Sequence, residues 1–216
     1  MTEIAYGPLP EHRFDYHSPP PASSPAPPQP QLLVFVHGGA WRSEDKADHA
    51  PLARTLARLT GWPVAPVQHP AHAEDVLRAL HFLTTWPAPG CAAPAQQLVL
   101  LGHSCSAHIL TSILLDQASA PSLTPAPPLL AATRAVVLSE GIYDLDALLR
   151  SFPDYKAWFV AAAFGDRDAY PDANTAAHPL RPARRTEAIH AHLVDVAGAD
   201  RVQKSWTRWT RATMSC

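Results

Sequence analysis

The most informative segment of the chain reads LVLLGHSCSAH and covers residues 98–108. Four consecutive apolar residues, Leu98 to Leu101, predict a β-strand that is buried on both faces. The strand runs directly into a turn of small residues around Ser104, and residues 105–117 carry a helical pattern. A serine in a tight strand-to-helix turn is typical of a nucleophile elbow, which exposes the hydroxyl at the edge of the sheet. The segment therefore predicts an α/β fold with Ser104 as candidate nucleophile.

The turn departs from the usual Gly-x-Ser-x-Gly pattern at one position. Gly102 is present, but Ser106 stands where the second glycine is expected. Because serine is also small, we expect the turn to form. The alternative interpretation is that Ser104 is an ordinary serine in a strand-to-helix loop.

Three residues beside Ser104 invite other roles. We expect Cys105 to contribute its backbone N–H to an oxyanion hole, whatever its side chain does. A histidine adjacent to the nucleophile points away from it, so His103 is not the expected general base. His108 is not well placed for that role either, and we interpret both histidines as structural.

A second segment carries two glycines after a strand. The apolar run LLVFV at residues 32–36 is followed by HGGAW, in which Gly38 and Gly39 allow the backbone to approach a ligand closely. An acyl-transfer enzyme needs N–H donors where the carbonyl oxygen becomes negative. We therefore expect the N–H groups of this loop and of Cys105 to form the oxyanion hole.

The rest of the chain alternates between short apolar runs and helical patterns. Further strands are predicted at 64–67 and 135–138, and helices at 45–60, 73–85, 154–164 and 186–196. Such alternation predicts a mostly parallel sheet with helices on both faces. We expect one domain over residues 1–216. Seven prolines among the thirteen residues 18–30 predict an extended linker or exposed loop; a PxxP ligand for a partner domain is the less favoured alternative.

The composition excludes several classes of function. The 216 residues carry a net charge of -2 with 17% charged residues, which gives no reason to expect nucleic acid or an acidic membrane surface as partner. No apolar run reaches the ~18 residues of a membrane span, and no signal peptide is evident. The three cysteines have no metal-ligand spacing and do not form an even set. We expect a cytoplasmic protein without metal or disulfides.

Taken together, HGGAW and GHSCSAH resemble the kynurenine formamidases, a family with the α/β-hydrolase fold. Further similar segments are GIYDL at 141–145, FPDY at 152–155, AFG at 163–165 and Tyr170, so the resemblance covers roughly residues 31–180. It implies hydrolysis of N-formyl-L-kynurenine, a small aryl formamide, to L-kynurenine and formate, without metal or organic cofactor.

The resemblance also implies roles for individual residues. Ser104 would attack the formyl carbon, and the N–H groups of the Gly38–Gly39 region and Cys105 would hold the oxyanion. His37 and Ala40 belong to the same motif. Trp41 and Tyr143 are candidates for lining the substrate pocket, and plain core packing is an equally good interpretation of both.

The expected acid and base are not found in the usual order of serine, acid and histidine. No apolar strand precedes the predicted helix 186–196, and no histidine follows Asp195 or Asp200, since His178, His190 and His192 come earlier. We expect that one late strand and its acid are missing, through deletion or alternative splicing. Glu140 and Asp144 are weak candidates for a displaced acid. A reading-frame shift near Arg208 is a further hypothesis, because re-reading residues 209–216 can give MDTGHDVL.

Three functions are therefore weighed against each other. The first is a formamidase, the second an esterase for small acyl esters on the same fold, and the third a truncated homologue with impaired catalysis. The oligomeric state stays open, with a homodimer as one alternative.

Overall fold

The computed structural model describes residues 1–20, 31–69, 72–91, 93–95, 97–116, 120–179 and 190–192. Its strands are β1 (Thr2–Ala5), β2 (Arg13–Tyr16), β3 (Gln31–Val36), β4 (Val64–Val67), β5 (Gln97–His103), β6 (Thr133–Ser139) and β7 (His190–His192). Its helices are α1 (Ala50–Thr60), α2 (Ala73–Leu83), α3 (Cys105–Leu114), α4 (Pro127–Ala132), α5 (Leu145–Ser151) and α6 (Ala161–Phe164), with a π-helical turn over Lys156–Val160. Short 3-10 turns cover Lys46–His49, Pro121–Leu123, Pro171–Ala173 and Thr175–Ala177.

The described strands form one mixed sheet in the order β1-β2-β4-β3-β5-β6-β7. The pairs β4–β3, β3–β5, β5–β6 and β6–β7 are parallel, whereas β1 and β2 run antiparallel to each other and β2 runs antiparallel to β4. The central strands are the continuous apolar runs of the sequence, as expected for strands covered on both faces. The mostly parallel sheet predicted from the sequence is thereby confirmed.

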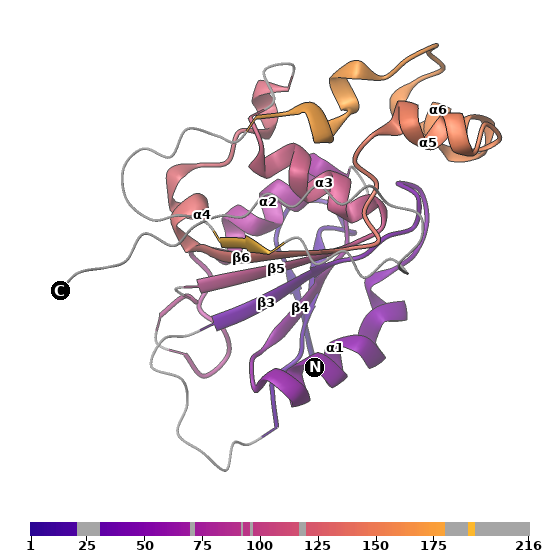
Figure 1. Cartoon of the computed structure of the whole chain (residues 1–216). Helices are drawn as coiled ribbons and strands as arrows, with labels where there is room; N and C mark the ends of the chain where they lie inside the picture. The colour runs from indigo at the N-terminus through magenta and orange to yellow at the C-terminus, as the bar shows by residue number, and fades with distance from the viewer. Residues whose placement is uncertain are drawn as a thin grey trace.

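Helices cover both faces of this sheet (Figure 1). On one face, Ala53 and Ala57 of α1 pack against Leu33 and Phe35 of β3 and against Val64. On the opposite face, α2 and α3 pack over the sheet and form the larger core, whose fully buried side chains include Leu80, Leu100 and Ile109. None of the described helices has the length and apolar character needed to cross a membrane.

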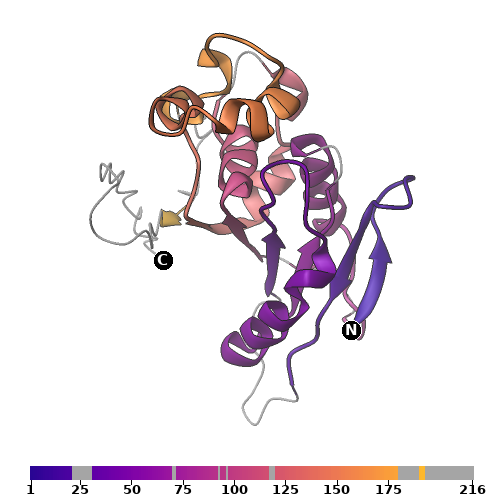
Figure 2. The same ribbon diagram turned by 90° about the vertical axis from the view of Figure 1, so that its right-hand side faces the viewer.

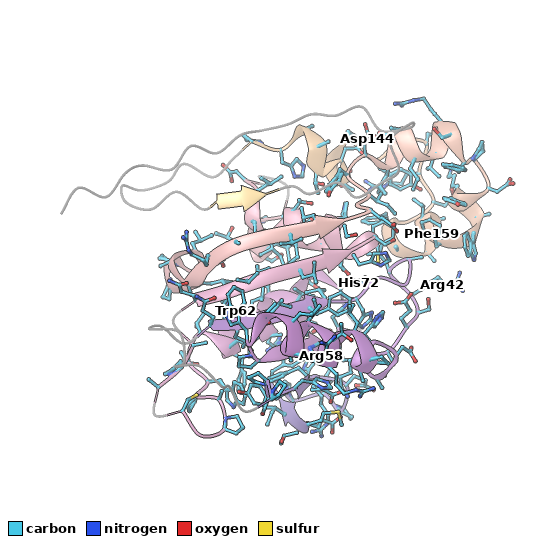
Figure 3. All side chains as sticks on the ribbon, turned by 60° about the horizontal axis from the view of Figure 1, so that its bottom comes forward. Arg42, Arg58, Trp62, His72, Asp144 and Phe159 are labelled. Carbon is cyan, nitrogen blue, oxygen red and sulfur yellow. The ribbon has the colours of Figure 1, made fainter. Side chains whose placement is uncertain are left out.

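The loops that follow β3, β4, β5 and β6 leave the sheet at one edge, because the carboxyl ends of parallel strands lie together. Arg42, which follows β3, and His72, which follows β4, lie at this end in Figure 3, whereas Trp62 lies towards the opposite end. The segment with α5 and α6 lies beyond the same edge, at the top of Figure 2. This edge therefore gathers the motif residues.

The structure differs from the predicted elements in several places. Helix α1 begins at Ala50 because Pro51 favours a first helical turn, and Lys46–His49 forms a separate 3-10 turn. The helix predicted at 186–196 is wrong at His190–His192, where β7 pairs with Ala135–Val137 of β6. The free backbone groups along β6 favour strand pairing over the local helical tendency. The strand and acid expected to be missing stay a prediction.

Three of the predicted features fall outside the described residues, in whole or in part. They are most of the proline-rich segment, at 21–30; the rest of the predicted helix, at 186–189 and 193–196; and the tail at 209–216.

Candidate active site

Ser104 lies in a strained turn between β5 and α3. Its backbone has φ 57° and ψ -122°, a region that costs a residue other than glycine about 1–3 kcal/mol. Its N–H donates to the carbonyl of Ser139 at the end of β6 (2.9 Å). Gly102 leaves little room for a larger residue, because a Cβ there would lie 2.9 Å from Leu110 Cδ1 and 3.0 Å from the Ser106 carbonyl oxygen. The predicted strand–turn–helix geometry around Ser104 is therefore present.

Ser106, the departure from the usual motif, has a structural role of its own. Its side chain is fully buried, and its hydroxyl donates a hydrogen bond to the carbonyl oxygen of His37. His69 Nε2 donates to the same oxygen (3.3 Å). The serine thus connects the turn after β5 to the loop after β3, a contact that a glycine cannot make.

The HGGAW loop is a tight turn built on the carbonyl of Gly39. The backbone N–H groups of Arg42 and Ser43 both donate to this oxygen at 3.0 Å, and the Ser43 hydroxyl donates to it at 2.9 Å. Gly39 has φ 98°, and a Cβ there would lie 2.0 Å from the Ser43 carbonyl oxygen. Ala40 and Trp41 follow with φ 54° and 56°, so the turn occupies left-handed backbone over three residues.

The two loops meet at Ser104. A Cβ on Gly38 would lie 3.3 Å from Ser104 Cβ and 3.2 Å from the His103 carbonyl oxygen, so glycine permits the close approach. The backbone N–H of Trp41 donates to Cys105 Sγ (3.4 Å). Because Cys105 is the first residue of α3, its N–H belongs to the turn that has no intrahelical acceptor. The structure therefore brings the predicted nucleophile and the predicted oxyanion loop together.

The Cys105 thiol is fully buried, and burial raises its pKa above the ordinary value of 9.0. A thiol needs its thiolate form to react as a nucleophile. This agrees with the prediction that Cys105 acts through its backbone rather than its side chain.

Trp41 packs in the core and also lines a cavity. Its ring is buried and makes edge contacts with His108 (5.4 Å between centroids) and Phe164 (5.0 Å). The same ring lines a cavity of about 180 Å³, together with His108, Ser112 and Arg167. Trp41 Nε1 is buried and has no hydrogen-bond partner among the described residues. An apolar cavity thus lies beside Trp41 of the HGGAW loop.

Tyr143 does not line this cavity. It is half-buried and packs against the core, and its ring lies so close to Gly141 that a Cβ there would approach the Tyr143 hydroxyl oxygen to 2.2 Å. The structure therefore favours the core-packing interpretation of Tyr143.

The histidines near the site are mostly buried and neutral. Burial lowers the pKa of His108 to about 4, and its Nε2 donates to the carbonyl of Ala173 (2.7 Å). Burial also lowers the pKa of His69 to about 3, with His37 nearby adding to the effect. Both rings serve as hydrogen-bonding core residues, in line with the structural interpretation of His108.

The weak acid candidates occupy separate places. Glu140, itself at φ 51°, has a largely exposed carboxylate whose Oε2 lies 3.2 Å from His103 Nε2. Asp144 caps α5 by accepting from the N–H of Ala147 (2.8 Å) and lies near the top of Figure 3. Within the part of the chain that the structure describes, no histidine or carboxylate is hydrogen-bonded to Ser104 Oγ.

One further cluster has no signature in the sequence. His37, Glu44 and His49 lie close enough for one ligand atom of each to fall within 4.8 Å of the others. Their spacing along the chain matches no familiar metal motif, so only the folded loop reveals the cluster.

Comparison with known proteins identifies the family of this chain. No protein-family model matches it. It is 30% identical over 181 residues to the kynurenine formamidase of Eremothecium gossypii, covering 76% of this chain and 72% of that protein. The chain belongs to the kynurenine formamidase family.

Two further comparisons bear on the length and the fold. The chain is 31% identical over 146 residues to the kynurenine formamidase of Meyerozyma guilliermondii and spans only about half of that relative (53%). Among solved structures, esterase B of Lactobacillus rhamnosis superposes with a TM-score of 0.62 at 16% identity, covering 76% of this chain and 56% of the esterase. At that identity the likeness concerns the fold, and it confirms the predicted α/β-hydrolase-like fold of this family member.

Proposed function

We propose that this chain hydrolyses N-formyl-L-kynurenine to L-kynurenine and formate, with Ser104 as the nucleophile. The observation that carries the proposal is the position of Ser104, in a strained turn directly against Gly38 of the HGGAW loop. Membership in the kynurenine formamidase family supports the choice of an aryl formamide as substrate.

In the proposed reaction, Ser104 Oγ attacks the formyl carbon and its proton passes to a water molecule, which returns a proton to the leaving nitrogen. The N–H groups of Cys105 and of the Gly38–Gly39 region stabilise the oxyanion, assisted by the positive end of α3. Collapse breaks the C–N bond, and the arylamine leaves with a proton. Water then attacks the formyl ester on Ser104, which releases formate and restores the serine.

The surroundings of the loop fit the two halves of this substrate. A formyl group is small, which suits the tight space that the close approach of Gly38 creates at Ser104. The aryl leaving group favours apolar walls. The cavity lined by Trp41 and Phe164 has such walls and touches the loop through Trp41, while Ser104 itself lies outside its lining. Trp41 Nε1, buried without a partner among the described residues, is a donor for the polar tail of the substrate.

The acid and base are the parts of the machinery that the proposal does not assign. Asp144 uses its carboxylate to cap α5, and Glu140 points a largely exposed carboxylate towards His103. A serine hydrolase with an oxyanion hole but no triad base retains about 10³–10⁴-fold catalysis over water, far below full activity. The rate of this chain relative to a homologue with a known triad therefore tests whether an acid and a base act in it.

The test uses the full 216-residue chain. Release of kynurenine from N-formyl-L-kynurenine is compared with hydrolysis of short p-nitrophenyl esters, in the natural chain and in Ser104→Ala. The exposed Ser122→Ala is the matched control. A fluorophosphonate probe with mass spectrometry locates the reactive serine, and circular dichroism checks that the variants fold.

We expect preference for the formamide, labelling of Ser104, and a loss of kcat/KM in Ser104→Ala with none in Ser122→Ala; the loss reaches about a thousandfold where a triad base acts in this chain. Preferential ester hydrolysis would favour the esterase alternative. Absence of hydrolysis, or an unchanged rate in Ser104→Ala, would refute the proposal and favour the impaired homologue or another nucleophile.

A further inference from the structure

We propose that His37, Glu44 and His49 form a binding site for a divalent transition-metal ion, with Zn²⁺ as the best-fitting class. One ligand atom from each of the three side chains lies within 4.8 Å of the other two. The site is separate from Ser104, and neither its existence nor its test depends on the hydrolase activity.

The fold of one short segment brings the three side chains together. His37 begins the loop after β3, Glu44 follows the HGGAW turn with φ 74°, and His49 immediately precedes α1. His49 Nε2 lies 2.8 Å from Glu44 Oε2. The rings of His37 and His49 are stacked, with centroids 5.6 Å apart and planes 12° from parallel, so His49 must turn before the in-plane lone pairs of both rings can reach one ion.

A simple surface ion pair between His49 and Glu44 would not explain the state of His37. Its Nδ1 lies 3.1 Å from the carbonyl oxygen of Gly38, and because a carbonyl only accepts, the hydrogen of the ring is on Nδ1. Its Nε2 therefore presents a lone pair.

That Nε2 atom is buried, in a residue only 2% exposed, and has no hydrogen-bond partner in the described part of the chain. The Gln68 side chain also lies near the His37 ring, and its amide oxygen accepts from the N–H of Lys46 (2.8 Å). A histidine that ligates a metal typically donates its other ring N–H to a backbone carbonyl, which is the arrangement of His37.

The donor set selects the class of ion. Two imidazoles and one carboxylate suit Zn²⁺ and its neighbours Co²⁺, Ni²⁺ and Cu²⁺, whereas Ca²⁺ and Mg²⁺ prefer oxygen ligands throughout. Bonds of about 2.0–2.1 Å in a tetrahedral site hold the ligand atoms about 3.3 Å apart. To bind an ion, the 2.8 Å contact between His49 and Glu44 must lengthen slightly, and the ligand atoms that lie up to 4.8 Å apart must come closer. Rotation of the exposed Glu44 and half-buried His49 side chains allows both changes. Water would complete the coordination.

Such an ion would brace the oxyanion loop. The segment from His37 to His49 contains the whole Gly38–Trp41 turn, so ligation at both of its ends ties the turn to the start of α1. An ion that binds only the folded chain raises the free energy of unfolding. Metal binding and thermal stability are therefore linked at this site.

The test titrates ZnCl₂ into the full chain by isothermal calorimetry, after chelator treatment and removal of any affinity tag. Glu44→Gln and His49→Gln remove one ligand each. His81→Gln is the matched control, because His81 is also half-buried but accepts from the N–H of Ala126 and lies outside the cluster. Visible d–d absorption of bound Co²⁺ reports the coordination directly, and circular dichroism verifies folding.

We expect one Zn²⁺ per chain, with unchanged affinity in His81→Gln. In Glu44→Gln and His49→Gln the affinity should fall by more than the tenfold to hundredfold or so that follows the loss of an outer-shell partner, because a direct ligand is removed. The Co²⁺ spectrum should change in the same two variants only. Absence of Zn²⁺ binding, or equal affinity in all four proteins, overturns the proposal, and equal affinity would place the ion at other histidines or cysteines. Both outcomes leave the formamidase proposal untouched.

Discussion

Replacing Gly39 with alanine tests whether the HGGAW turn depends on the backbone of that glycine. At φ 98°, an alanine pays about 1–2 kcal/mol for left-handed backbone alone. Its Cβ would also lie 2.0 Å from the Ser43 carbonyl oxygen, so the turn must open. Opening weakens three hydrogen bonds to the Gly39 carbonyl, each with a net contribution of about 0.5–1.5 kcal/mol. Gly39→Ala should therefore lower the free energy of unfolding by about 3–4 kcal/mol in all.

Gly61→Ala is the matched comparison. Gly61 ends α1 with φ 70°, but a Cβ there meets nothing within 4 Å, so only the backbone strain of about 1–2 kcal/mol applies. Urea unfolding followed by circular dichroism measures both variants, and thermal melting should show Gly39→Ala about 10 °C below the natural chain. If Gly39→Ala is no less stable than Gly61→Ala, the close contact with Ser43 does not constrain the turn and the reasoning fails.

Three further outcomes are expected. Burial lowers the pKa of His108 from 6.5 to about 4, so the unfolded chain binds the proton first as pH falls. The contribution of the neutral His108 ring to the free energy of unfolding is therefore complete above about pH 6.5 and decreases by about 2 kcal/mol by about pH 5. An NMR titration of the His108 ring checks this, and protonation near 6.5 in the folded chain would contradict it. Iodoacetamide should alkylate the exposed Cys91 of the native chain and leave the buried Cys105 unmodified, and mass spectrometry measures both. Equal modification of the two cysteines would show that the turn around Ser104 is open. Ser106→Gly restores the usual motif and should lower the free energy of unfolding in urea by about 2 kcal/mol. The hydrogen bond to the His37 carbonyl is lost, and glycine weakens the helix. Unchanged stability would mean that this bond contributes nothing.

Much of the fold follows from local patterns in the chain. The apolar runs at 32–36, 64–67, 98–101 and 135–138 lie in β3, β4, β5 and β6, and their length and continuity predicted a parallel sheet covered on both faces. The strand–turn–helix order around Ser104 predicted its strained turn in the same way. These features depend on neighbouring residues, so the sequence contains them.

Other features depend on contacts between distant residues. The polar β1 is mostly exposed and carries no apolar pattern, so it is identified only through its pairing with β2, and β7 only through its pairing with β6. The spacing of the glycines predicted a close approach, but the contact of Gly38 with Ser104 becomes visible only when β3 and β5 lie side by side.

The most specific details of the site belong to this second group. In the sequence, Ser106 is a small residue that replaces the usual glycine. In the structure, its hydroxyl donates to the carbonyl oxygen of His37, 69 residues away. Glu44 and His49 are unremarkable in sequence, and they meet His37 only because the HGGAW turn folds the chain back on itself. Local patterns determine which elements form, because backbone preferences and burial act over a few residues. The partners of individual polar atoms are determined by how those elements pack, since hydrogen bonds and metal ligation act over a few ångströms in space regardless of separation along the chain.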